Sequence, residues 1–244
     1  GQGRRGPEGK RLRHLTTSSS KLVGRGLLGL IQEAGEPAAD PAQFGFTPAR
    51  GCVEAVLLQD ETTRRILARH NLLRISFDIK QAFPSLDHRG LIRSVSRWPL
   101  PAQEHGWNLL RVLVHSTATV LCPGPSTPKL GLRRGVCQGS VEGPFLFRAV
   151  FDLVAVEVRL RLRQVAAEWD LPVGLTEWRC ESDWIDEDLP APLVSALRAQ
   201  EVILDSGLVI FADDSEVLLP VPRFWQAHRW QALIHEVIDQ VGQV

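Results

Sequence analysis

The segment LVIFADDSEVLL, at residues 208–219, constrains the fold more than any other part of the chain. Two apolar runs flank the adjacent carboxylates Asp213 and Asp214, and this pattern predicts a β-hairpin whose tight turn carries both acids. Adjacent like charges repel one another and resist desolvation, so they are costly at a turn unless a cation binds there. Aspartate is also a common turn former, and an Asp-Asp pair alone is as readily explained by turn formation.

A third carboxylate, Asp78, follows the apolar run in LLRISFDIK at residues 72–80. A strand that ends there brings the Asp78 side chain to the rim of a sheet. Two such rims brought together can hold two divalent ions about 3.5–4 Å apart, which activate an attacking hydroxyl and stabilise in-line displacement at phosphorus. The alternative for Asp78 is the N-cap of a following helix.

Hydrophobic periodicity and turn signals divide the chain into helices and short strands. Helices are predicted over residues 21–33, 53–70, 87–97, 107–115, 144–169, 193–200 and 225–241, and strands over residues 72–79, 117–122, 208–212 and 216–219. The helix at 53–70 has apolar residues for a buried face, namely Val53, Ala55, Val56, Leu57, Ile66 and Leu67. Residues 1–13 are expected to be extended and basic, and residues 177–192 form an acidic insertion.

The composition, with 44% hydrophobic and 23% charged residues over 244 positions, is that of a globular protein. No stretch approaches the ~20 apolar residues of a membrane span, and the polar start is unlike a signal peptide. We therefore expect no membrane partner and an intracellular location, in the nucleus or cytoplasm. The four cysteines lack metal-site or disulfide spacing and are expected to be reduced, mostly buried thiols. Because the chain contains no Met, we expect an internal piece of a longer product or a processed chain.

The formal net charge of zero conceals an uneven distribution of charge. The first 25 residues are strongly basic, whereas residues 177–216 are densely acidic. A basic arm suits phosphate groups and an acidic centre suits metal ions, although ordinary solvated surface charge explains the same distribution.

Three motifs occur in a specific order: FDIKQAF, then GVCQGSVEGP, then FADD. In this order they resemble the consecutive palm motifs of reverse transcriptases, most closely those of non-LTR retrotransposons and group II introns. Upstream, KRLRHLTTSSSKL is similar to the first finger motif of this family, and QFGFTPARGCVEAV to its Gln-x-Gly-Phe block. The resemblance implies an α/β fold, a right-hand palm with a ferredoxin-like antiparallel sheet and largely helical fingers, with the thumb missing.

The resemblance also implies a division of the chain. Residues 1–70 would form the fingers, residues 71–97 the palm with the first Asp motif, residues 98–143 a connection with the Gln-Gly motif, and residues 144–244 the palm with the FADD hairpin and a closing helix. Residue 244 precedes the Lys-bearing motif and thumb of the family, so other domains of a longer polyprotein are expected.

The metal ligands implied by the resemblance are the catalytic Asp78 and Asp213, with Asp214 as the second carboxylate of the turn and the backbone of Ile79 assisting. They would bind two Mg²⁺ ions, with Mn²⁺ as a substitute. No organic cofactor is implied.

The substrates would be an RNA template, a DNA primer and deoxynucleoside triphosphates. Phe83 would lie under the sugar of the incoming nucleotide, although core packing also explains an aromatic residue there. Gln138 and Gly139 would lie against the nucleotide, and Pro144 would open the long helix. Arg11 would clamp the triphosphate, with its neighbours Lys10 and Arg13 able to take the role. Contacts with nucleic acid are expected from Arg13, Lys21 and Arg50.

The implied reaction is RNA-directed addition of deoxynucleotides to a primer 3′-hydroxyl. Some positions depart from the family pattern: Leu12 and His14 replace a Pro-Ile context, SVEGP follows Gln138 in an unusual form, and the acidic insertion is long. One alternative is an inactive retroelement remnant that retains the fold and binds RNA. The other is an unrelated metal-dependent phosphotransfer enzyme that uses the Asp-Asp turn.

Overall fold

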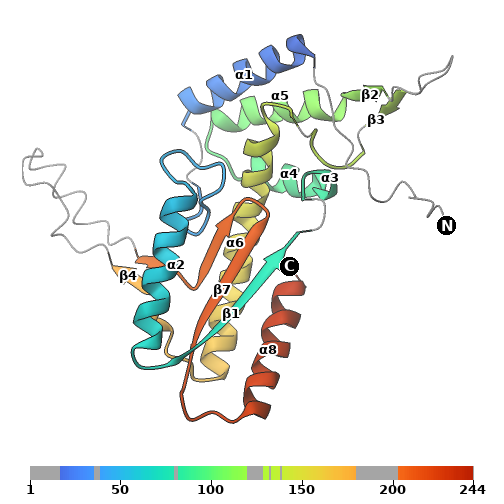
Figure 1. Cartoon of the computed structure of the whole chain (residues 1–244). Helices are drawn as coiled ribbons and strands as arrows, with labels where there is room; N and C mark the ends of the chain where they lie inside the picture. The colour runs from blue at the N-terminus through green and yellow to red at the C-terminus, as the bar shows by residue number, and fades with distance from the viewer. Residues whose placement is uncertain are drawn as a thin grey trace, which may run out of the picture. The chain divides into compact units, whose positions relative to one another are not determined.

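The computed structural model describes residues 17–35, 39–79, 82–119, 129–131, 133–137, 139–179 and 203–243. The chain divides into two compact units, each built from two stretches of sequence: unit 1 comprises Gly1–Ala38 and Lys80–Val150, and unit 2 comprises Ala39–Ile79 and Phe151–Val244. The predicted division into fingers and palm stays a prediction. The helix α6 (Gly143–Glu168) contributes residues to both units (Figure 1).

Unit 2 is built on an antiparallel sheet with the strand order β1-β7-β6. Its strands are β1 (Asn71–Asp78), β6 (Leu208–Phe211) and β7 (Asp214–Val221). The predicted hairpin is confirmed, with β6 and β7 joined through residues 212 and 213. The central strand β7 is apolar and buried over Val217–Val221, because it has a hydrogen-bonded strand on each side.

Helix α2 (Cys52–Leu67) contacts all three strands of this sheet. Its buried residues are Ala55, Thr62 and Ile66. The predicted buried face of this helix is therefore wrong for four members, which are exposed: Val53, Val56, Leu57 and Leu67. Small residues allow the helix to approach the sheet, and Thr62 Oγ1 donates a hydrogen bond to Ser206 Oγ at 2.9 Å.

The remaining elements of unit 2 are two short paired strands, a 3₁₀ turn and a closing helix. These are η2 (Val173–Leu175), β4 (Glu177–Arg179), β5 (Ile203–Asp205) and α8 (Ala227–Gly242). Leu233 and Val237 are the buried residues of α8. The predicted helix at residues 193–200 lies outside the described residues.

Unit 1 is mainly helical. It contains α1 (Ser18–Glu33), α3 (Ala82–Ser85), α4 (His88–Val95), α5 (Ala102–Val114), β2 (Thr117–Thr119) and β3 (Lys129–Gly131). Thr17 caps α1 by accepting a hydrogen bond from Ser20 N at 3.2 Å, and Asp87 caps α4 through Arg89 N at 3.2 Å. Helix α5 packs against α1 and α4. It begins five residues earlier than predicted, and within it Gly106 lies against the Trp98 ring, where a Cβ atom would be 2.7 Å from Cζ3.

The structure is thus a mixture of helices and small antiparallel sheets, which confirms the predicted α/β class at that level. Within the described ranges, no helix is long and apolar enough to cross a membrane. The expectation of mostly buried thiols is wrong for Cys52, which is exposed at the first residue of α2, whereas Cys137 is half-buried.

Candidate active site

The three predicted carboxylates lie at one end of the sheet in unit 2. Asp78 ends β1, and Asp214 begins β7 as its direct cross-strand partner. Directly opposed residues of an antiparallel pair have Cβ atoms about 4.5–5.5 Å apart on the same face. Both residues are exposed, and Asp213, in the adjoining turn, is half-buried. The register therefore brings two acids face to face, with the third one residue away.

This arrangement fits a divalent cation in its donor chemistry. Carboxylate oxygens are the ligands that Mg²⁺ and Mn²⁺ prefer, and like charges placed opposite each other destabilise a sheet unless they are neutralised. In the part of the chain that the structure describes, however, no three His, Cys, Asp or Glu side chains form a ready-made metal cluster. The structure supplies a facing pair, Asp78 and Asp214, with Asp213 in the adjoining turn.

The neighbouring acid on this face of the sheet has a counterion. Glu216 is paired across the strands with Ser76, and its Oε2 atom lies 2.6 Å from Nη2 of Arg74. No comparable ion pair reaches Asp78 or Asp214 among the described residues. The negative charge on this face is therefore least compensated at the end where the two strands bring their aspartates together.

The turn at Ala212 and Asp213 is supported by the Gln-x-Gly-Phe block. Gln43 forms a parallel bridge with Ile210, where Phe44 N donates to the Ile210 carbonyl and Ile210 N to the Ala42 carbonyl, both at 2.8 Å. At Gly45, an added Cβ would lie 2.1 Å from Ala212 N, so only glycine allows this approach. Ala212 has a φ of 58°, a left-handed conformation that costs a non-glycine residue about 1 kcal/mol.

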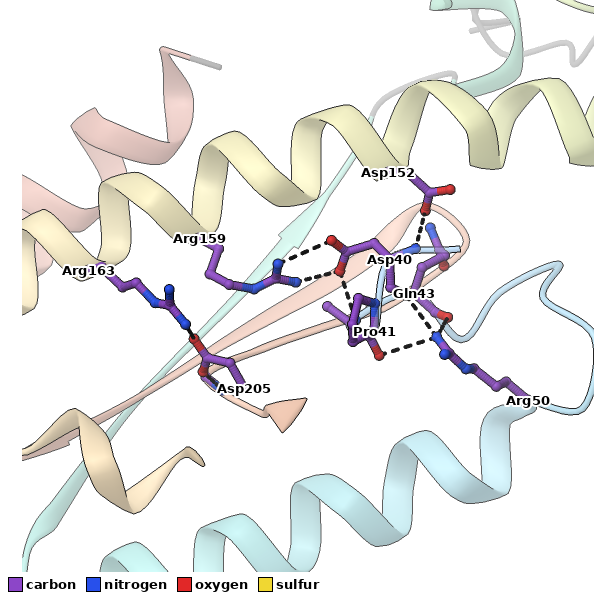
Figure 2. Close-up of polar contacts among 10 residues, drawn as sticks. Asp40, Pro41, Gln43, Arg50, Asp152, Arg159, Arg163 and Asp205 are labelled. Atoms are coloured by element: carbon purple, nitrogen blue, oxygen red, sulfur yellow. Dashed lines mark hydrogen bonds and ion pairs between the residues drawn. The ribbon is translucent and has the colours of Figure 1, made fainter. Parts of the chain in front are cut away.

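Arg50, predicted to contact nucleic acid, holds this block from within. Its Nη1 donates to the carbonyl oxygens of Asp40 at 2.8 Å and Gln43 at 3.1 Å (Figure 2). Gln43 is fully buried, and its Oε1 accepts a hydrogen bond from Gly45 N at 2.9 Å. Sequence reasoning missed this structural role of Arg50, and its contact with nucleic acid stays a prediction.

In unit 1, the loop of the GVCQGS motif lies on the segment that follows FDIK. Gly135 N donates to the Leu86 carbonyl at 2.8 Å, and Val136 N donates to the Phe83 carbonyl at 2.9 Å. His88 Nε2 lies 2.9 Å from the Gly135 carbonyl oxygen. Gly135 has a φ of 78°, and a Cβ there would be 2.6 Å from the Pro84 carbonyl oxygen. Two motifs about 50 residues apart are thus joined by main-chain hydrogen bonds.

Phe83 is half-buried in this unit. Its ring stacks on that of Phe147, with centroids 4.9 Å apart and an interplanar angle of 18°. Phe147 is fully buried on α6. Phe83 therefore has a packing role, which leaves its predicted contact with a nucleotide sugar untested.

The Gln-Gly motif leads into α6. Gly139 is exposed with a φ of 89°, and Ser140 Oγ accepts a hydrogen bond from Gly143 N at 3.0 Å. Pro144 lies in the first turn of α6, as predicted. Lys21 is exposed on α1. Three predicted site residues lie outside the described residues: Arg11, Arg13 and Gln138.

The half-buried Cys137 precedes this motif. Burial raises the pKa of its thiol above the ordinary value, and the negative charge of Glu142 raises it further. A raised pKa favours the neutral thiol, which is a poor nucleophile and metal ligand. The expectation that Cys137 is reduced stays a prediction, and its side chain is half-buried where a mostly buried thiol was expected.

Comparison with known proteins places the chain in a family. Residues 4–219 match the family model described as reverse transcriptase (RNA-dependent DNA polymerase), so the chain belongs to the reverse transcriptase family. This membership overturns the alternative of an unrelated phosphotransfer enzyme.

A retrotransposon protein is among the relatives. The chain is similar to the Retrovirus-related Pol polyprotein from type-1 retrotransposable element R2 of Popillia japonica, with 33% identity over 114 residues. The match covers 46% of this chain and 16% of that polyprotein, so it spans about a sixth of the relative's length. The predicted resemblance to retrotransposon reverse transcriptases is confirmed.

Proposed function

We propose that the chain catalyses RNA-directed addition of deoxynucleotides to the 3′-hydroxyl of a DNA primer, within a larger retroelement polyprotein. The observation that carries the proposal is the facing pair of Asp78 and Asp214, with Asp213 in the adjoining turn, in a member of the reverse transcriptase family. Residues 71–97 and 144–244, which contain this pair and its turn, would form the palm, and residues 1–70 would form the fingers.

Asp78, Asp213 and Asp214 would hold the divalent ions, Mg²⁺ or Mn²⁺, with the Ile79 carbonyl as a further ligand. When bound, two such ions would lower the pKa of the primer hydroxyl and stabilise the charge that develops at phosphorus. Asp78 and Asp214 are exposed, so their carboxylates are accessible to an ion from solvent. The paired strands fix their backbone positions, which limits the reorganisation needed when an ion binds.

The remaining assignments concern substrate binding. Phe83, Gln138 and Gly139 would contact the incoming nucleotide, and Arg11 its triphosphate. Arg13, Lys21 and Arg50 would contact the nucleic-acid backbone, where cations supply most of the affinity. In Gly139, the positive φ and the exposure support close approach of a ligand to the main chain.

The test is extension of a DNA primer on an RNA template by the intact polyprotein that carries this chain. We expect Asp78→Asn and Asp213→Asn to abolish incorporation, because a neutral amide binds Mg²⁺ poorly, while circular dichroism shows a native fold. The matched control is Asp239→Asn, at an exposed position of α8, which should extend the primer normally. Near-native incorporation by Asp213→Asn would remove this residue from the site.

The second candidate is an inactive remnant that retains the fold and RNA binding. It is favoured by the departures from the family pattern at Leu12 and His14 and in the SVEGP segment that follows the Gln-Gly pair. A native polyprotein that binds RNA but extends no primer with either Mg²⁺ or Mn²⁺ would establish this second function.

A further inference from the structure

A buried polar network lies beneath the Gln-x-Gly-Phe block, entirely within unit 2 (Figure 2). Asp40 and Arg159 form a two-pronged ion pair, in which Nη1 donates to Oδ2 at 3.1 Å and Nη2 donates to Oδ1. The two side chains are only 4% and 17% exposed. Asp40 Oδ1 also accepts a hydrogen bond from Ala42 N at 2.8 Å, so the same carboxylate shapes the backbone that follows it.

Helix α6 anchors this network through two residues. Asp152 Oδ1 accepts a hydrogen bond from Asp40 N at 3.2 Å, and Arg159 holds the Asp40 side chain. Asp152 and Arg159 are seven residues apart, which places them on one side of the helix. Residues 40–43 are thus held by α6 through Asp40 and by Arg50 through their carbonyl groups.

The held segment leads directly to the turn that carries Asp213. Ala42, within this segment, and Phe44, just after it, form main-chain hydrogen bonds with Ile210, and Gly45 lies against the Ala212 backbone. The contacts therefore form a continuous path from α6 through Asp40 and Gly45 to Ala212. A left-handed alanine persists only where its surroundings dictate the backbone conformation, and Gly45 supplies such a contact.

We propose that Asp40, Arg50 and Arg159 act as positioning residues for the Ala212–Asp213 turn, and so set the placement of Asp213 and Asp214 relative to Asp78. A buried ion pair often contributes little net stability compared with apolar residues of similar size, and fixing one arrangement is its best-attested use. The clamp formed by Asp40, Arg50 and Arg159 acts through the backbone and touches no reacting group. Its catalytic consequence rests on the proposed function, because the turn carries the proposed cation ligands.

The first test uses arginine variants in the intact protein. Hydrogen exchange of the 208–219 segment reports the turn, and Mn²⁺ affinity, measured by electron paramagnetic resonance, reports the carboxylates. Arg159→Met should speed exchange in this segment and weaken Mn²⁺ binding about tenfold. Arg159→Lys keeps the positive charge but loses the two-pronged guanidinium contact, so it should restore part of the slow exchange and part of the Mn²⁺ affinity. The control is Arg163→Met, one turn along α6, whose partner Asp205, at 3.4 Å, lies outside the path described above.

The second test avoids the ion pair and so remains decisive if Arg159→Met does not fold. Gly45→Ala places a Cβ atom against the turn backbone and should weaken Mn²⁺ binding by a similar factor. Gly174→Ala is its control in the same unit, because an added Cβ there meets nothing within 4 Å. Both should be compared at a temperature where circular dichroism shows each variant to be folded.

The outcomes separate the clamp from the proposed function. Faster exchange together with weaker Mn²⁺ binding, in Arg159→Met and Gly45→Ala but not in their controls, supports the clamp. Unchanged exchange, or changed exchange with unchanged affinity, overturns it. If Asp78→Asn leaves Mn²⁺ binding of the native protein unaltered, the proposed cation site is wrong, and the catalytic meaning of the clamp falls with it.

Discussion

Substitution of Phe83 by alanine tests whether this residue selects the nucleotide sugar or only packs the core. Complete truncation of a fully buried Phe costs about 3–5 kcal/mol. Phe83 is half-buried, and its ring stacks on that of Phe147 with centroids 4.9 Å apart, so we expect a loss of about 2 kcal/mol in the free energy of unfolding. For a protein of this size, that loss lowers the Tm by about 4–8 °C.

The sugar-selecting role makes a separate prediction about substrates. A ring beneath the sugar would collide with a 2′-hydroxyl, and discrimination would then arise from repulsion of the ribonucleotide. Phe83→Ala should therefore raise incorporation of ribonucleotides far more than it lowers incorporation of deoxynucleotides. The assay is the ratio of kcat/KM for a matched pair of deoxy- and ribonucleotides, measured alongside the Tm in the active polyprotein.

Phe147→Ala is the matched control, because it removes the other half of the same stacked pair from a fully buried position. It should lower the Tm at least as much as Phe83→Ala but change the substrate ratio less, because the Phe83 ring itself is retained. A ratio that is also unchanged in Phe83→Ala, with the expected loss of stability, would refute the sugar-selecting role and leave Phe83 as a packing residue.

Other predictions follow from the carboxylates, from the Cys137 thiol and from the larger polyprotein proposed above. Asp214→Asn should raise the free energy of unfolding by about 0.2–1 kcal/mol in metal-free urea titrations, because it removes a like charge opposite Asp78; a loss of stability would contradict this. The pKa of Cys137 is raised in the folded protein, so this thiol ionises at a lower pH in the unfolded chain than in the folded one. The neutral thiol therefore makes its full contribution to stability below the ordinary thiol pKa, and this contribution is lost as the pH rises through the raised pKa of the folded protein. Cys137→Ser should flatten this alkaline decline in urea titrations, and an unaltered decline would assign it elsewhere. This chain alone should bind primer-template more weakly than the intact polyprotein in a salt titration, and equal affinities would refute the expected role of further domains.

The hairpin was predictable from sequence, but its register was not. The apolar runs predicted a turn around Asp213 and Asp214, and the structure places the turn at Ala212 and Asp213 instead. Alanine rarely adopts a positive φ, so Ala212 gave no local turn signal. One residue of register decides which aspartate faces Asp78, and it is Asp214. The close approach of Asp78 to Asp213, implied by the family resemblance, stays a prediction.

The buried side of α2 was wrongly predicted for a related reason. Hydrophobic periodicity weights large apolar residues. The side facing inward carries the large residue Ile66, as predicted, but also the small residues Ala55 and Thr62, whereas Leu57 is exposed. Close helix–sheet packing favours small residues, which contribute little to a hydrophobic pattern. The boundaries of the helix itself were predicted well, because they depend on length and on chain breakers and not on which side faces inward.

The support of the turn was beyond sequence reasoning because its parts are distant in the chain. The family resemblance marked Gly45 and Arg50 without giving a physical reason, and Asp40 and Arg159 carried no signal at all. Their pairing spans 119 residues and depends on the loop reaching α6. Only the structure shows that Arg50 donates hydrogen bonds to backbone carbonyl oxygens. From sequence, Arg50 was assigned to nucleic-acid contact alone.

The distribution of counterions gives an independent argument for the cation site. Acids of unit 2 around the sheet are neutralised one by one by arginines: Asp40 by Arg159, Asp205 by Arg163 and Glu216 by Arg74. Across the described ranges no such pair reaches the three aspartates at the hairpin end, although the whole chain holds 28 basic and 28 acidic residues. Adjacent carboxylates that none of the described cations neutralises repel one another, and the binding of cations relieves this repulsion. Neutral substitutions at this end should therefore reduce cation binding while leaving the free energy of unfolding level or higher. Removal of Arg159 should also reduce cation binding but should lower the free energy of unfolding.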